Sequence, residues 1–196
     1  PIGDIYDSFK KSLESEFEGL DPDITEENLQ SRCRGVILMA LSNKSGDLVL
    51  TTGNKSETAV GYSTLYGDTA GGFGVLKDVP KTLVYNLSKY RNTVSQVIPE
   101  RIITRPPSAE LAPDQQDSDS LPDYDTLDKI IELYVEQDKS KQEIEQSGIE
   151  RSILDRVIRL IDLSEYKRRQ APLGVKITAR GFGKDRRYPI TNKFLK

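Results

Sequence analysis

Histidine is absent from this chain of 196 residues, and cysteine occurs once, at Cys33. The lack of histidine excludes histidine-dependent catalytic triads and histidine-ligated metal sites. Any catalysis must therefore use carboxylates, lysines, arginines, hydroxyls and backbone groups. A single cysteine cannot form a disulfide within the chain, which is consistent with a reducing compartment, and we expect the protein to be cytoplasmic.

Long apolar runs are also lacking. No stretch approaches the ~18 residues that a membrane-spanning helix needs, and the first residues, PIGDIYDSFKK, contain no apolar signal-peptide core. The apolar fraction is only 36%, whereas 30% of the residues are charged. We therefore expect no membrane partner, and a globular domain with a largely polar surface or a part of a larger protein.

The charges are unevenly distributed along the chain. Residues 167–196 hold ten basic side chains and one acid, a net charge of +9; because the whole chain carries −3, residues 1–166 carry −12. A basic tail of this kind favours phosphate groups or an acidic protein surface. No nucleic-acid-binding motif accompanies it, and the acidic remainder repels a polyanion, so we expect no nucleic-acid partner.

The apolar spacing predicts many helices and few strands. Predicted helices cover residues 5–17, 25–43, 79–90, 125–136, 141–146 and 149–163, with a helical turn at 58–62. Thr25 is the expected cap of the second helix. Strand-like runs occur at residues 47–51 and 175–178, and residues 71–74 are expected to form a flexible loop. Two strands are too few for a doubly wound α/β domain, so we expect further strands upstream of residue 1.

A polar turn, residues 52–57, follows the first strand-like run. In α/β proteins ligands bind at the carboxyl ends of parallel strands. The Thr52 hydroxyl and the backbone amides can contact a nucleotide, and the Glu57 carboxylate can hold Mg²⁺ against phosphates. An ordinary helix start capped by Asn54 or Ser56 explains the same residues, and the pattern alone does not decide between the two interpretations.

Three other polar segments have two interpretations each. The loop 105–122, at the start of an acidic stretch, is either a mobile surface loop or a lid over a ligand. Asp68 and Lys81 fit a ribose hydroxyl and a phosphate, or are ordinary surface charges. The basic run 167–169 either complements a helix dipole or binds phosphate.

Four collinear segments, which cover most of the chain, resemble NAD synthetases. They are TEENLQSRCRGVILMALSN, LVLTTGNKSETAVGYSTLYGDTAGGFGVLKDVPKTLVY, RIITRPPSAELAPDQQDSDSLPDYDTLD and EYKRRQAPLGVKITARGFGKDRRYPITNKF. The GGFGVLKDVPKT and KDRRYPITN runs are similar to the glutamine-dependent branch. The resemblance implies an α/β fold, a partial three-layer α/β/α domain of the pyrophosphatase-loop ATPase type. Residues 1–172 then form the C-terminal part of the synthetase domain, and 173–196 form a basic tail.

The resemblance also implies a reaction. Family members are carbon–nitrogen ligases that use ATP and Mg²⁺ to adenylate the nicotinate carboxylate of deamido-NAD. Ammonia, which a separate glutaminase domain supplies from glutamine, then displaces AMP to give NAD. The family's SGGxDS phosphate loop and the glutaminase domain are absent from this sequence. We therefore expect the isolated chain to be inactive. A homodimer or larger homo-oligomer is expected, and the alternative function is a non-catalytic oligomerisation or docking module.

Individual roles follow from the same resemblance. Asn28, Arg32, Glu57, Lys167 and Arg168 are expected to contact deamido-NAD. Thr52, Lys81 and Ser108 are expected to contact ATP, and Glu57 to bind Mg²⁺. Lys81 is the candidate catalytic residue, because adenylation needs charge to be neutralised on the leaving pyrophosphate and a fixed cation does this without a proton shuttle. Tyr62 and Tyr66 are expected near the nicotinate ring.

Overall fold

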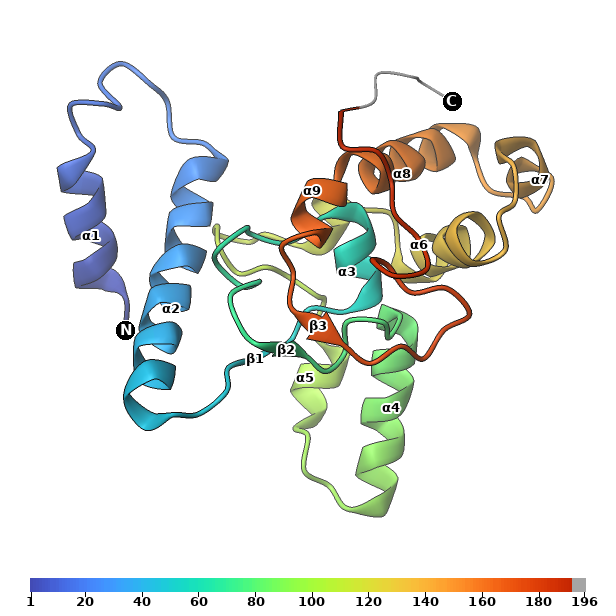
Figure 1. Cartoon of the computed structure of the whole chain (residues 1–196), viewed down its shortest axis with the longest axis horizontal. Coiled ribbons are helices and arrows are strands. Elements are labelled where there is room, and N and C mark those ends of the chain that lie inside the picture. Colours follow the sequence, from blue (N-terminus) through green and yellow to red (C-terminus); the bar gives the residue numbers. More distant parts are fainter. Residues whose placement is uncertain (192–196) are drawn as a thin grey trace.

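A computed structural model describes residues 1–191, in which α-helices of 4 to 22 residues accompany a very small sheet (Figure 1). The helices of the first half are α1 (Gly3–Ser12), α2 (Ile24–Ser45), α3 (Lys55–Val60), α4 (Lys81–Val94) and α5 (Glu100–Thr104). The second half holds a 3-10 turn η1 (Asp117–Asp119), α6 (Tyr124–Ile131), a π-helical turn η2 (Glu132–Glu136), α7 (Lys141–Glu145), α8 (Arg151–Leu163) and α9 (Glu165–Arg168). The strands are β1 (Leu50–Thr51), β2 (Phe73–Gly74) and β3 (Leu173–Gly174).

The sheet is parallel, with the strand order β1-β2-β3. It corrects two expectations: residues 71–74 contain a strand rather than only a flexible loop, and the C-terminal strand precedes 175–178 instead of occupying it. A two-residue strand is too short to show alternating hydrophobicity, which is why the pattern missed β2 and misplaced β3. Gly174 permits a very close approach of the strands, because a Cβ there would lie 2.4 Å from the carbonyl oxygen of Gly74.

The hydrophobic core lies among α3, α6, η2, α7 and α8. Its fully buried members include Ala59, Leu127, Ile130, Val135, Ile144, Leu154, Val157 and Ile161. The predicted helix 149–163 is confirmed as α8, whose buried residues recur at helical spacing. The predicted helix 125–136 is divided, because its last turn widens to the π-helix η2.

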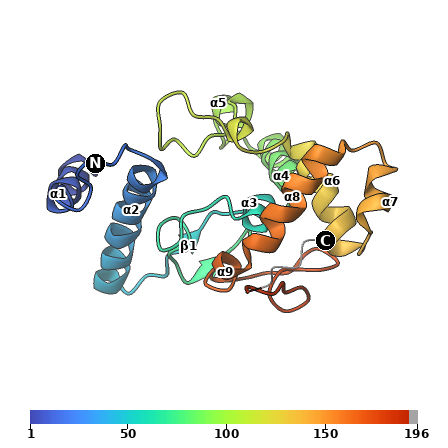
Figure 2. The same ribbon diagram turned by 90° about the horizontal axis from the view of Figure 1, so that it is seen from above.

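Helices α1 and α2 stand side by side at one end of the molecule (Figure 1, Figure 2). The cap of α2 is Asp23 and not Thr25: the Asp23 carboxylate accepts a bond from the Thr25 amide at 2.7 Å, and Glu26 accepts one from the Asp23 amide at 2.8 Å. Both residues are good caps, so the pattern could not choose between them. No helix among residues 1–191 has the length and apolar character needed to cross a membrane.

The C-terminal segment contacts the core as far as Tyr188. Tyr188 is only 6% exposed and stacks on Tyr134, with ring centroids 6.1 Å apart. Arg180 and Arg186 both form ion pairs with Asp138 at the end of η2. The boundary at residue 172 stays a prediction, and Phe182 and Tyr188, beyond that boundary, pack with the core of the preceding part.

Candidate functional site

The helix that follows strand β1, α3, begins at the predicted polar turn. Asn54 caps α3, accepting a hydrogen bond from the Glu57 amide at 3.0 Å, while Glu57 Oε2 accepts one from the Asn54 amide at 3.3 Å. The capping interpretation of this turn is therefore correct for Asn54. It does not exclude the ligand-binding one, because the reciprocal bonds orient Glu57 and use only one of its two carboxylate oxygens.

That second oxygen meets Lys81, the first residue of α4. Lys81 Nζ lies 2.9 Å from Glu57 Oε1, and both side chains are 19% exposed. Burial lowers the pKa of Lys81, but the Glu57 carboxylate more than offsets this, so the pKa is raised above its ordinary value. The ammonium also lies 5.2 Å from the centre of the Tyr124 ring. The site thus contains a permanent cation and a carboxylate that point to the same place.

This pair lines a cavity of about 940 Å³, a size typical of small-molecule and cofactor sites. Five of the eight predicted site residues line it: Asn28, Glu57, Lys81, Ser108 and Lys167. They come from α2, α3, α4, the loop after α5, and α9, so the fold collects residues that are far apart in the sequence. The loop 105–122 forms part of the wall, which is compatible with the lid interpretation.

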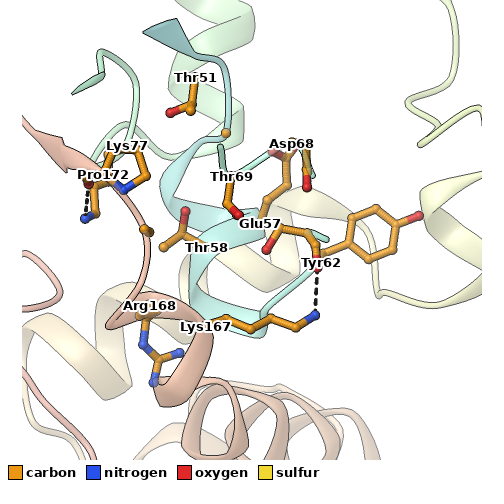
Figure 3. A pocket seen from close by; sticks show the side chains of 13 residues that line it. Thr51, Glu57, Thr58, Tyr62, Asp68, Thr69, Lys77, Lys167, Arg168 and Pro172 are labelled. Carbon is orange, nitrogen blue, oxygen red and sulfur yellow. Dashed lines mark hydrogen bonds between the residues drawn. The ribbon is translucent and has the colours of Figure 1, made fainter. Parts of the chain in front are cut away.

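A second, smaller hollow of about 40 Å³ adjoins the first (Figure 3). Glu57, Tyr62, Asp68 and Lys167 line both. Lys167 Nζ donates hydrogen bonds to the carbonyl oxygens of Gly61 and Ser63, each at 2.7 Å. Burial is the main cause of the lowered pKa of Lys167. These contacts hold the ammonium at the boundary between the two hollows.

Three predicted residues do not line the large cavity. Thr52 is exposed and lies in neither hollow, although Thr51 and Gly53 beside it line the small one. Arg32 Nε donates to the carbonyl oxygen of Leu65 at 3.2 Å.

Arg168 borders the small hollow, but its guanidinium is engaged with the protein. It donates to the carbonyl oxygens of Ala59 and Ile161, both at 2.6 Å, and to Glu165 at 3.1 Å. The ligand contacts assigned to Thr52, Arg32 and Arg168, like those assigned to the five residues that line the cavity, stay predictions.

Asp117 is a cavity residue that the sequence reasoning did not single out. It is 4% exposed; Tyr124 donates a hydrogen bond to Oδ2 at 2.6 Å, and Oδ1 accepts none within residues 1–191. Burial first, and then the hydrogen bond to Asp117, raise the pKa of Tyr124 well above its usual range. Its position in a run of seven acids concealed it, because charge alone does not distinguish a buried carboxylate from solvated neighbours.

The expected metal ligand, Glu57, lies beside Lys81 in the wall of the large cavity. Within the described part of the chain, no group of three or more acidic, histidine or cysteine side chains is placed to hold a metal ion. Mg²⁺ is commonly bound by one or two carboxylates together with substrate phosphates. Glu57 therefore fits as a single Mg²⁺ ligand beside a phosphate, and Lys81 fits as the neighbouring phosphate contact.

Comparisons with known proteins agree in one family. The model of the NAD synthase family matches residues 1–171. Glutamine-dependent NAD(+) synthetase of Acinetobacter baylyi is 58% identical over 193 residues, which cover 97% of this chain and 36% of that protein. The solved glutamine-dependent NAD+ synthetase of Acinetobacter baumannii in complex with ADP is 51% identical (TM-score 0.53; 97% of this chain, 34% of that chain). The one from Cytophaga hutchinsonii is 25% identical (TM-score 0.72; 97% and 33%).

This chain spans about a third of the length of these relatives. The solved neighbours confirm the expected fold class, the α/β adenine nucleotide alpha-hydrolase type, present here as a helix-rich part with a small parallel sheet. The resemblance on which the site residues were selected is likewise confirmed, by a match that extends over nearly nine-tenths of the sequence. The chain belongs to the NAD synthase family.

Proposed function

We propose that this chain forms part of the substrate cleft of a carbon–nitrogen ligase that converts deamido-NAD to NAD with ATP, using ammonia that a glutaminase domain releases from glutamine. The observation that carries the proposal is the Glu57–Lys81 pair in the wall of a cavity that also contains Asn28, Ser108 and Lys167. The ADP complex of the Acinetobacter baumannii relative supports nucleotide binding.

The roles follow from charge and position. ATP, which would be bound with Mg²⁺, supplies the adenylyl group: the nicotinate carboxylate forms a bond to its α-phosphorus, the α–β phosphoanhydride bond breaks, and negative charge is left on the departing pyrophosphate. Ammonia then displaces AMP from the adenylated carboxylate to give the amide. Lys81 neutralises that charge from a fixed position, Glu57 provides a metal ligand, and Ser108 and Thr52 contact the nucleotide. Deamido-NAD is bound by Glu57 and by the remaining predicted contacts, Asn28, Arg32, Lys167 and Arg168.

Nucleotide binding by the chain itself tests this proposal. We compare titration calorimetry of MgATP with the unchanged chain, with Lys81→Gln, and with Lys89→Gln, a control on the exposed surface of the same helix. Loss of a charge-assisted contact weakens binding by about tenfold or more, so Lys81→Gln should bind MgATP at least that much more weakly and Lys89→Gln as the unchanged chain. Equal affinity of all three proteins, or no binding by the unchanged chain, would overturn the proposal.

Catalytic turnover by the chain alone is a separate question from nucleotide binding. The SGGxDS loop and its aspartate do not occur in this sequence, so half of the phosphate-binding groups are missing. We expect no ATP–pyrophosphate exchange by the 196-residue chain. Clear exchange activity would show that the residues present are sufficient for adenylation.

A role in self-association is the second candidate, and one observation favours it. Apolar side chains on α2 are exposed, Val36 by 63%, Leu41 by 60% and Leu38 by 48%. Exposed apolar side chains gathered on one helix are typical of a surface that is covered in an assembly. We propose a homodimer or larger homo-oligomer. Sedimentation of the chain and of a Val36→Glu/Leu41→Glu variant tests this: a dimer that becomes monomeric supports it, and an unchanged mass contradicts it.

A further inference from the structure

Asp128, on α6, joins the starts of two other helices. Its Oδ2 accepts hydrogen bonds from the amide of Thr82 at 2.9 Å and from the Thr82 hydroxyl at 2.8 Å, and its Oδ1 accepts one from the Ser56 hydroxyl. Ser56 Oγ in turn accepts a bond from the Lys81 amide at 2.8 Å. One carboxylate therefore connects the first turn of α3 with the first turn of α4.

These bonds compensate for a missing cap on α4. The residue before this helix is Pro80, which has no side chain that can accept a hydrogen bond. The first amides of a helix need acceptors, and an anion near them is stabilised by the helix dipole. Ser56 satisfies the Lys81 amide and Asp128 satisfies the Thr82 amide. The cap of α4 is thus supplied by α3 and α6.

The same bonds determine how two segments lie against each other. The Lys55 amide donates to the carbonyl oxygen of Val79 at 2.9 Å, and the Ser56–Lys81 contact follows directly. Glu57 is the next residue along α3. The geometry of the Glu57–Lys81 ion pair is therefore set by neighbouring bonds that end on Asp128, although Asp128 does not line the large cavity.

We propose that Asp128 is a positioning residue for the Glu57–Lys81 pair: it holds the starts of α3 and α4 together so that the Lys81 ammonium is presented to the bound phosphate. This inference depends on the proposed function in one respect only, namely that a phosphate group binds beside Lys81. Asp128 does not touch the ligand, and it acts through Lys81. A merely structural residue would change the stability of the chain and leave the affinity of the folded fraction unchanged.

A double-mutant cycle with MgATP separates these roles. Asp128→Ala is measured in the unchanged chain and in Lys81→Gln, with Asp125→Ala, an exposed position at the start of α6, as control. We expect Asp128→Ala to weaken MgATP binding about tenfold in the first background and to have no further effect in the second, while Asp125→Ala changes neither. Equal losses in both backgrounds, or no loss in the first, would overturn the proposal. Asp128→Asn and Ser56→Ala provide milder variants if circular dichroism shows that Asp128→Ala does not fold.

A ligand-free measurement distinguishes failure of this proposal from failure of the proposed function. In ¹H–¹⁵N spectra of lysine ammonium groups at pH 6, a persistent ion pair slows exchange of the Lys81 protons, and the resonance is assigned by its loss in Lys81→Gln. Asp128→Ala should broaden this signal and Asp125→Ala should not. If Asp128→Ala leaves this signal unaffected, Asp128 does not position Lys81, even where nucleotide binding is as expected. If the Lys81→Gln variant binds MgATP as well as the unchanged chain does, only the proposed function is contradicted.

Discussion

Lys55 Nζ lies 3.1 Å from Asp78 Oδ1, and the Lys55 side chain has no solvent exposure. The ammonium also contacts Glu136 at 2.8 Å and the hydroxyl of Thr178. Asp78 Oδ2 accepts bonds from the amides of Ile177 and Thr178, both at 2.8 Å. This cluster joins the start of α3, the loop after β2, the end of η2 and the C-terminal segment. It therefore supports the turn that contains Glu57.

The first prediction concerns the cation of this cluster. Lys55→Met leaves the carboxylates of Asp78 and Glu136 without their shared cation. Removing one partner of a buried ion pair typically costs about 3–5 kcal/mol, and we expect a loss of this size in the free energy of unfolding. Urea denaturation measures it, with the surface variant Lys89→Met as control. A loss below about 1 kcal/mol, the value of a surface pair, would show that the cluster does not support the fold.

The second prediction concerns acid stability. Burial alone raises the pKa of Asp78, but the bonds from Thr178 and Ile177 and the charge of Lys55 outweigh it, so the pKa in the folded chain is lowered from 3.8. The unfolded chain binds this proton first as the pH falls. The stabilisation from Asp78 is therefore complete above about pH 4 and is lost as the pH decreases through the folded pKa.

Unfolding free energies between pH 6 and 2 test this. Asp78→Asn should show a shallower decline below about pH 4 than the unchanged chain, and Asp119→Asn, an exposed position, should show the same decline as the unchanged chain. Identical slopes for Asp78→Asn and the unchanged chain would mean that Asp78 titrates normally in the folded state.

The third prediction concerns the glycine that ends α3. Gly61 has φ +69°, and a Cβ there would lie 2.2 Å from Ser164 Oγ. Ser164 Oγ donates to the carbonyl oxygen of Val60 at 2.9 Å, so it cannot move without losing that bond. Gly46 at the end of α2 has φ +78° and open space around it. It is therefore a control for backbone strain alone.

We expect Gly46→Ala to cost about 1–2 kcal/mol from the left-handed conformation, and Gly61→Ala to cost about 1–3 kcal/mol more because of the overlap. Because Lys167 bonds to the carbonyl oxygen of Gly61, Gly61→Ala should also weaken deamido-NAD binding. Chemical denaturation and calorimetry measure the two effects. Equal costs for both variants would indicate that α9 is not packed against this turn.

The fourth prediction concerns Lys167 itself. Lys167→Met removes an ammonium from the boundary of the two hollows, and we expect deamido-NAD binding to weaken about tenfold or more. Lys184→Met, an exposed change of the same charge, should leave binding unchanged. Burial lowers the pKa of Lys167, so its ammonium should lose its proton at a lower pH than that of an ordinary lysine. As the solution becomes alkaline, the contribution of this charge to deamido-NAD binding should therefore be lost at a lower pH as well. Affinities measured from pH 7 to 10 with both variants test this.

Local sequence patterns were sufficient to predict an element where the residues of that element alone produce the pattern. The apolar spacing of Leu154, Val157 and Ile161 predicted α8, because a helix buries a single face. The sequence offered Asn54 or Ser56 as a cap before a helical turn at 58–62, because capping involves neighbours in sequence, and the structure shows Asn54 as the cap of a helix that begins earlier, at Lys55. β1 lies within the predicted run 47–51, but β2 escaped prediction and β3 was misplaced, since Phe73–Gly74 is extended only through its bonds to β1 and β3.

The residue types of the candidate site, and the absence of histidine among them, were readable from the chain, as was its family. The sequence did not show that these residues lie together in the folded chain. Glu57 and Lys81 are 24 positions apart and approach because Ser56 and Asp128 accept hydrogen bonds from the Lys81 and Thr82 amides at the start of α4. Such bonds satisfy buried polar groups from distant segments, and no periodicity along the sequence encodes them. Composition and local spacing therefore settled the chemistry that is available, and long-range packing settled where it is placed.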